Sequence, residues 1–174
     1  LDKTGTATTG KMTLVDVVLE PGTTREEALR IVGALEHASE HPIAQAIANG
    51  AADEVGELPP IESFANREGL GVEGVVDGHG VIAGRPALLA DWGVTPSDAL
   101  LTAKADAEAQ ARTAILAAWD GQVRALFVVA DTVKPTSAEA IGRLRDLGRT
   151  PILLTGDNTA AARSVAAQVG ITEV

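Results

Sequence analysis

The sequence contains no cysteine and no tyrosine, and its aromatic residues are limited to two Phe and two Trp among 174 residues. The missing cysteines exclude a disulfide framework, a thiolate metal site and a cysteine nucleophile. So few aromatic residues argue against a platform on which nucleic-acid bases stack. Lys and Arg total 14 against 24 Asp and Glu, and the resulting net charge of −10 disfavours nucleic acid and anionic membranes as partners.

Long hydrophobic runs are also missing. The best short run, 125–130, is far below the roughly 20 residues that cross a bilayer. Apolar residues make up 45% and charged residues 22% of the chain, which is typical of a globular protein that buries a core. The first residue is Leu1 and a motif begins at the next position, so we expect the chain to be a piece of a longer protein.

Residue patterns between positions 11 and 125 predict an antiparallel sheet with helices. A capping box at Thr24 and Glu27 and a proline at position 42 predict two helix starts. Asp-Gly pairs at 77–78 and 120–121, each between short apolar runs, predict hairpins. The predicted strands are 12–20, 61–67, 70–76, 81–83, 114–119 and 122–129, and the later helices are 86–91 and 96–111.

The last part of the chain changes character. Helix 137–147, a buried strand 151–154 and helix 158–169 alternate as in a doubly wound parallel domain, whereas the first ten residues predict a loop. We therefore expect an α/β chain overall. An α+β domain over 11–125, with an antiparallel sheet flanked by helices, is inserted between two pieces, 1–10 and 126–174, of an incomplete doubly wound domain.

The most informative string is Asp2-Lys3-Thr4-Gly5-Thr6. An Asp carboxylate can attack a phosphoryl group and hold it as an aspartyl phosphate. The Gly and Thr residues after it offer backbone N–H groups and hydroxyls to the phosphoryl oxygens. An ordinary polar turn is the alternative for any single Asp, but a given five-residue string arises by chance in such a chain with a probability on the order of 10⁻⁴ or less.

This string resembles the phosphorylation signature of the P-type ATPases, whose phosphorylation domain belongs to the haloacid dehalogenase-like group. The resemblance implies that Asp2 is the phosphorylated nucleophile, that Lys3 and Thr4 assist it, and that Asp2 and Thr4 hold Mg²⁺ in the complete enzyme. Related phosphatases carry a second Asp as general acid and base where this chain has Thr4. The phosphoenzyme is therefore expected to hydrolyse slowly.

Thr155-Gly156-Asp157-Asn158 fits the same family, because it follows a predicted strand and opens a predicted helix, as a phosphate-contacting loop does. By the resemblance, Thr155 and Gly156 contact the transferred phosphoryl group, and Asp157 lies beside the nucleotide near Lys3. A plain helix cap is the alternative for this string taken alone.

The middle of the chain resembles one branch of that family. Ser39-Glu40-His41-Pro42 is similar to the His-Pro signature of heavy-metal-transporting P-type ATPases. The resemblance implies that Glu36 accepts a hydrogen bond from the adenine amino group and that His41 orients the nucleotide. Gly69 and Gly71 then let the purine approach the backbone, because glycine has no Cβ. Each residue alone also fits a capping or solvated role, whereas their joint order favours a nucleotide site.

Gly84-Arg85 stands where many family members have Gly-Asn near the nucleotide, which makes Gly84 a further expected contact and leaves the role of Arg85 open. The family's Mg²⁺-binding Asp motif and its later phosphate-binding Lys are missing from the sequence. Phosphoryl transfer depends on positioning and charge neutralisation, so we expect this fragment to bind ATP without hydrolysing it. In the complete enzyme the hinges are expected near Gly10 and Asp131.

The sequence thus predicts an ATP-binding cytoplasmic fragment of a P-type ATPase that pumps heavy-metal ions, with copper favoured, and with ATP and Mg²⁺ as cofactors of the complete enzyme. Its expected partners are the transmembrane and actuator domains of the same protein, at the cytoplasmic face of a membrane. Two alternatives stay open. One is a haloacid dehalogenase-like phosphatase with an inserted cap domain, and the other is a non-catalytic nucleotide-binding or docking module.

Overall fold

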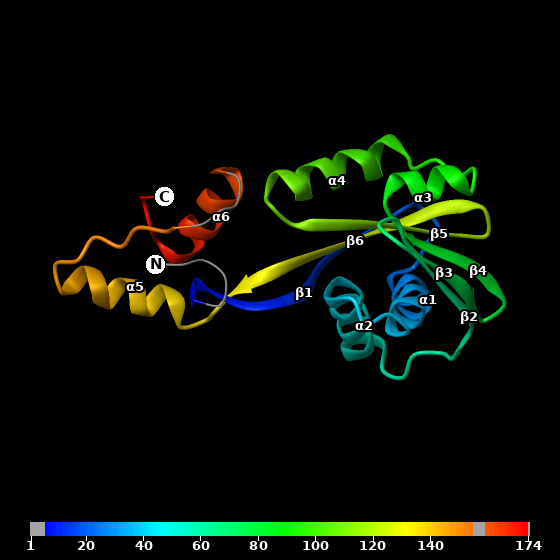
Figure 1. Cartoon of the computed structure of the whole chain (residues 1–174), viewed down its shortest axis with the longest axis horizontal. Helices are drawn as coiled ribbons and strands as arrows, with labels where there is room; N and C mark the ends of the chain where they lie inside the picture. The colour runs from blue at the N-terminus through cyan, green and yellow to red at the C-terminus, as the bar shows by residue number, and fades with distance from the viewer. Residues whose placement is uncertain (1–5, 155–158, 174) are drawn as a thin grey trace.

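The structure, a computed structural model, describes residues 6–154 and 159–173. Its centre is an antiparallel six-stranded sheet in the order β1-β6-β5-β4-β3-β2. The strands are β1 (Thr8–Leu19), β2 (Ile61–Arg67), β3 (Gly71–Val76), β4 (His79–Gly84), β5 (Thr113–Trp119) and β6 (Gln122–Val133). Helices α1 (Arg25–His37) and α2 (Pro42–Val55) cover one face, and α3 (Pro86–Asp91) and α4 (Asp98–Ala109) cover the other (Figure 1).

Because helices cover both faces of the sheet, its central strands are apolar at nearly every position. Trp119 and Phe127 are buried in the cluster formed with α1 and α2. Leu116 and Leu126, on the same two strands, are buried in the cluster formed with α3 and α4. Successive side chains of a strand point to opposite faces of the sheet, so these strands contribute to two separate cores. Hydrophobic burial is the main force that holds the three layers together.

Local signals in the sequence set most of these boundaries. Thr24 Oγ1 accepts a hydrogen bond from the Glu27 N–H at 3.2 Å and so caps α1. Ser97 Oγ accepts from the Leu100 N–H at 3.2 Å and begins α4, two residues later than predicted. The left-handed φ angles of Asp77 (49°) and Gly78 (76°) make the tight turn between β3 and β4. The hairpin at 120–121 has the same geometry, so both hairpin predictions are confirmed.

Two predicted segments differ from the structure in their type of secondary structure. Thr8 to Gly10 belong to β1 and not to a loop, because they pair with the end of β6, which runs four residues past its predicted end. The predicted strand 151–154 is wrong as a continuous strand. Ile152 and Leu154 make isolated β-bridges, that of Ile152 being parallel to Glu173, and of these four residues Pro151 and Leu153 are buried.

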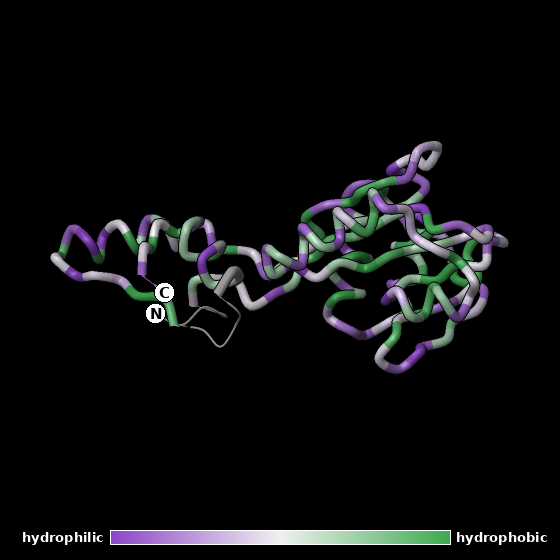
Figure 2. Tube along the Cα trace, turned by 90° about the horizontal axis from the view of Figure 1, so that it is seen from above, coloured by the Kyte–Doolittle hydropathy of each residue, from purple (hydrophilic) through white to green (hydrophobic). Residues whose placement is uncertain are grey.

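A smaller part of the chain lies at one end of the molecule. It contains α5 (Ser137–Asp146) and α6 (Thr159–Val169). Figure 2 shows it joined by a narrow waist to the larger part of the molecule, which consists of the six-stranded sheet and helices α1 to α4. That waist is the paired ends of β1 and β6, in which Thr8 lies opposite Val133. The boundaries predicted at residues 10 and 125 fall inside these two strands. No helix in the described part of the chain has the length and apolar character needed to span a membrane.

Asp131 fastens this two-stranded connection. Its carboxylate accepts hydrogen bonds from Thr8 Oγ1 at 2.5 Å, from Thr9 Oγ1 at 3.3 Å and from the Gly10 N–H at 2.9 Å. A carboxylate that accepts several donors holds them more strongly than a neutral acceptor would. Asp131 therefore fixes the first residues of β1 against β6 at the point where the larger part begins.

We predict that Asp131→Ala makes the Gly10 amide exchange its hydrogen at least about tenfold faster, because a hydrogen bond to a charged group stabilises by about 1.5–3 kcal/mol. Amide exchange measured by NMR checks this. Asp131→Asn keeps one acceptor oxygen and should give an intermediate rate. Asp16→Ala removes the same charge from β1, where its carboxylate accepts from the Val17 N–H, and should leave Gly10 unchanged. Equal exchange in Asp131→Ala and the wild type would contradict the prediction.

Candidate functional site

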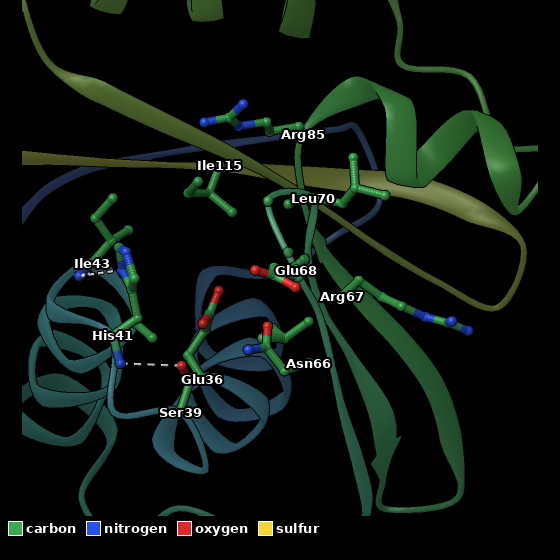
Figure 3. A pocket seen from close by; sticks show the side chains of 16 residues that line it. Glu36, Ser39, His41, Ile43, Asn66, Arg67, Glu68, Leu70, Arg85 and Ile115 are labelled. Carbon is green, nitrogen blue, oxygen red and sulfur yellow. Dashed lines mark hydrogen bonds between the residues drawn. The ribbon is translucent and has the colours of Figure 1, made fainter.

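A pocket of about 390 Å³ lies between the α1–α2 corner and the β2–β3 connection (Figure 3). Its volume is within the range of about 300–1,000 Å³ that small-molecule sites occupy. All five residues predicted from the sequence to contact a nucleotide line it, although they are spread over nearly fifty positions of the chain. They are Glu36, His41, Gly69, Gly71 and Gly84.

Glu36 forms the inner wall of the pocket. It lies on the last turn of α1, its residue is only 4% exposed, and its carboxyl group points into the cavity (Figure 3). Among the described residues, no cation or hydrogen-bond donor pairs with this carboxyl group. Burial without a partner disfavours the charged form and raises the pKa of Glu36 from 4.5 to about 8. The pocket therefore holds a carboxyl group with unused hydrogen-bonding capacity.

His41 stands at the N-terminus of α2. Its Nδ1 accepts a hydrogen bond from the Ile43 N–H at 3.3 Å, so the side chain caps the helix. Its own backbone N–H donates to Ser39 Oγ at 3.3 Å, which holds the corner in place. With Nδ1 occupied as an acceptor, the neutral ring carries its proton on Nε2. The capping role is thus real, and it leaves Nε2–H as a donor for a molecule in the pocket.

Gly71 and Gly84 bring two strands unusually close. They are partners in the β3–β4 pairing, and a Cβ on Gly71 would lie 2.2 Å from the Ala83 carbonyl oxygen. A Cβ on Gly84 would lie 2.2 Å from the Leu70 carbonyl oxygen. The sequence interpretation attributed Gly71 to close approach of a purine, and the structure supplies a different physical reason, the packing of backbone on backbone.

The backbone conformation at position 69 accounts for the glycine found there. Its φ of 72° is left-handed, and a Cβ there would meet nothing within 4 Å. It is the third residue of a turn that the Leu70 N–H closes by donating to the Arg67 carbonyl oxygen at 2.9 Å. Such a position favours glycine. The turn forms the rim of the pocket opposite His41.

Two arginines line the pocket, and they differ in what they contact. Arg67 points away from the cavity (Figure 3) and pairs with Glu73 at 2.6 Å, which raises the pKa of Arg67 and lowers that of Glu73. Trp92 Nε1 also donates to Glu73, at 3.1 Å. Arg85 has no such partner among the described residues, and its guanidinium lies over the pocket near Ile115 (Figure 3). Arg85 is therefore the available cation at this opening.

Some lining residues gave no usable signal in the sequence. Asn66 comes from β2, Ile115 from β5 and Ile43 from the first turn of α2, and each looks like an ordinary strand or helix residue. Ile115 lies near the predicted nucleotide-binding residues because the strand order places β5 next to β4. The hydrophobic period of these segments predicted burial but not which cavity the side chains would reach.

The predicted phosphoryl-transfer residues lie outside the residues that the structure describes. They are Asp2, Lys3, Thr4, Thr155, Gly156 and Asp157. Within 6–154 and 159–173, no group of three or more His, Asp or Glu side chains is arranged to hold a metal ion. The predicted Mg²⁺ ligands, Asp2 and Thr4, lie outside these ranges.

The burial of Glu36 should make folding stability depend on pH. The unfolded chain ionises Glu36 above pH 4.5 whereas the folded chain keeps the proton until about pH 8, so stability falls as pH rises across this window. We predict that wild-type protein loses stability relative to Glu36→Gln, on the order of 4 kcal/mol between pH 4.5 and 8. Urea denaturation of both proteins at several pH values measures the difference. Parallel stability curves for the two proteins would contradict it.

Comparison with known proteins places the chain in a family. The family model described as haloacid dehalogenase-like hydrolase matches residues 1–174. A copper-transporting P-type ATPase of Rhizobium leguminosarum bv. viciae is 40% identical over 175 residues, which cover 100% of this chain and 21% of that protein. The cation-transporting P-type ATPase B of Mycobacterium tuberculosis is 41% identical over 174 residues, covering 98% and 23%. The chain thus spans about a fifth of the length of these relatives.

Solved structures agree. A crystal structure of a zinc-transporting PIB-type ATPase matches 99% of this chain and 28% of its own, with a TM-score of 0.88 and 31% identity. The N-domain of HMA6, a copper-transporting P-type ATPase, matches 68% of this chain and 98% of its own, with a TM-score of 0.58. At 20% identity this second match shows likeness of fold alone. The predicted mixed α/β fold and the resemblance to heavy-metal P-type ATPases are confirmed, and the chain belongs to the haloacid dehalogenase-like hydrolase family.

Proposed function

We propose that this chain is the ATP-binding part, with pieces of the phosphorylation domain, of a P-type ATPase that pumps a heavy-metal ion across a membrane. The observation that carries the proposal is the gathering of Glu36, His41, Gly69, Gly71 and Gly84 around one pocket of about 390 Å³. The relatives, which are named as transporters of copper or of cations, support the parent function. Copper is favoured by the Ser39-Glu40-His41-Pro42 string and by the copper-transporting relative.

The pocket suits ATP in three respects. The side chains of Ile43 and Ile115 offer an apolar surface to the flat adenine ring. Glu36 and the Nε2–H of His41 offer hydrogen bonds to the base and to the rest of the nucleotide. Arg85, at the open side of the pocket, supplies a positive charge for the phosphates. Polar contacts and a tight cavity thus replace the aromatic stacking that this chain has too few aromatic residues to provide.

In the complete enzyme, the chain's own residues would carry out the transfer. The Asp2 carboxylate attacks the γ-phosphorus of ATP, a new P–O bond forms, and the bond to the ADP oxygen breaks. Lys3, Thr155 and Gly156 hold the phosphoryl oxygens, and Asp157 lies beside the nucleotide. Asp2 and Thr4 would contribute ligands to Mg²⁺, which neutralises charge on the phosphates. Thr4 cannot act as a general base, so the phosphoenzyme persists.

The remaining parts of that enzyme complete the proposal. The transmembrane and actuator domains of the same protein would be the partners of this chain, which would lie at the cytoplasmic face of the membrane. Closure of the larger part about the β1–β6 connection would bring the γ-phosphate to Asp2. The Asp131 hydrogen bonds to Thr8, Thr9 and Gly10 lie at that connection and would keep its two strands together during closure.

The first prediction from this function concerns ATP affinity. Wild-type protein should bind ATP with a Kd of about 0.1–5 mM, roughly −3 to −5.5 kcal/mol, and His41→Ala should weaken it about tenfold. An NMR titration with ATP measures both values. The shifts should centre on Glu36, His41, Gly69 and Gly71.

Two further variants separate binding from helix capping. His41→Asn keeps a capping side chain at the start of α2 but removes the Nε2 donor, so it should remain folded and still bind weakly. His79→Ala changes a histidine that pairs with Asp120 at 2.9 Å, away from the pocket, and should bind like the wild type. Absence of shifts in folded wild-type protein at about 10 mM ATP, at least about twice the expected Kd, would contradict the proposed function.

The second prediction concerns turnover. ATP hydrolysis and steady-state phosphoenzyme should stay at the level of an Asp2→Asn control, because the chain lacks the family's Mg²⁺-binding Asp motif. Release of inorganic phosphate and retention of radiolabel from γ-labelled ATP measure the two quantities. A rate well above that of Asp2→Asn would show that the fragment is a complete catalyst. Hydrolysis of a small phosphate ester would instead favour a phosphatase.

A further inference from the structure

Glu36 is a buried acid with no counter-ion among the described residues. The charged or titratable groups that line the same pocket come from three neighbouring segments: His41 before α2, Arg67 and Glu68 at the end of β2 and just after it, and Arg85 before α3. Arg67 points outward to Glu73, and Glu68 carries the same charge as Glu36 (Figure 3). From α1 itself, Glu36 is the only residue that lines the pocket. Neither Arg85 nor His41 forms an ion pair with Glu36, and burial alone raises its pKa, so none of these groups neutralises an ionised Glu36.

The protonation state of a carboxyl group decides what it can bind. An ionised carboxylate only accepts hydrogen bonds, whereas the neutral acid accepts with one oxygen and donates with the other. Adenine presents a donor, its N6 amino group, beside an acceptor ring nitrogen, and the glutamine amide matches that pair with one acceptor and one donor. The neutral acid has the same arrangement of acceptor and donor as that amide. An ionised carboxylate would face the ring nitrogen with a second acceptor.

We propose that Glu36 binds adenine as a neutral carboxylic acid, accepting a hydrogen bond from the N6 amino group and donating one to the adjacent ring nitrogen. The inference rests on the proposed binding of ATP in this pocket and adds the protonation state in which Glu36 recognises the adenine base. ATP phosphates bring several negative charges to a chain whose net charge is already −10, which further favours the neutral acid. Binding then selects adenine by a donor and acceptor pair and weakens in alkaline solution.

The size of the pH effect follows from the raised pKa of Glu36, about 8. If only the neutral acid binds, the apparent Kd rises in inverse proportion to the protonated fraction. Between pH 7 and pH 9 the affinity of the wild type for ATP should therefore fall about tenfold. Ionisation of ATP itself is the same whichever variant it binds, so the ratio of wild-type to variant affinity isolates Glu36.

Calorimetric titration of the 174-residue chain with ATP at pH 7, 8 and 9 tests the proposal. Glu36→Gln, which keeps an acceptor and a donor but does not ionise, should bind within about threefold of the wild type at pH 7 and lose the fall toward pH 9. Glu36→Ala should bind at least about tenfold more weakly at pH 7. Glu68→Gln removes the same charge from an exposed position at the rim and should retain the wild-type fall.

A spectroscopic measurement does not depend on any variant. The side-chain carboxyl ¹³C resonance of Glu36 in the ATP complex should report a protonated acid at pH 7. An ionised resonance, or Glu36→Gln as weak as Glu36→Ala in folded protein, would overturn the neutral-acid proposal while ATP binding itself stands. No binding of ATP by the wild type at any of these pH values would overturn the proposed function instead.

Discussion

The packing of the last turn of α1 against β3 is the interaction on which the pocket depends. Leu35 is fully buried there, and a Cβ on Gly74 would lie 2.9 Å from its Cδ1 and 2.2 Å from the Ser63 carbonyl oxygen. Because Gly74 has no side chain, α1 can pack closely against β3. Because Glu36 follows Leu35 on the same turn, the helix carries its carboxyl group to the inner wall of the pocket, where the residue is largely buried. Hydrophobic burial of one residue thus sets the electrostatics of the next.

The opposite wall of the pocket comes from a second close approach, between β3 and β4. Gly71 and Gly84 let the two backbones approach more closely than side chains would permit, and the Arg85 N–H donates to the Leu70 carbonyl oxygen at 2.8 Å. This contact places the β2–β3 turn and the start of α3 side by side. The pocket is consequently a product of the sheet topology, in which a rigid scaffold carries short connecting segments whose polar groups face a ligand.

Much of this arrangement could be predicted because its signals are local. The Thr24 cap, the proline that begins α2 and the two Asp-Gly hairpins depend on residues within a few positions of one another, and all were predicted. The family resemblance supplied the pocket residues in advance. What the sequence could not supply depends on contacts between distant residues. Strand order and packing, which no local pattern encodes, determine three features of the structure. They are the pairing of Thr8 with Val133, the position of Ile115 in the wall of the pocket and the burial of the Glu36 carboxyl group.

The antiparallel pairing of β1 with β6 has a consequence for protein engineering. The chain enters the larger part along β1 and leaves it along β6, so the segment between them begins and ends at one place. A unit whose two ends lie side by side can be exchanged as a cassette without new linkers, since only the paired strands must match their host. Chimaeras that join this segment at Gly10 and Asp131 to the remaining domains of one of the P-type ATPase relatives would keep both ends in register. In such hybrids, the pocket between α1, α2 and the β2–β3 turn would be exchanged as one unit, independently of the domains of the host.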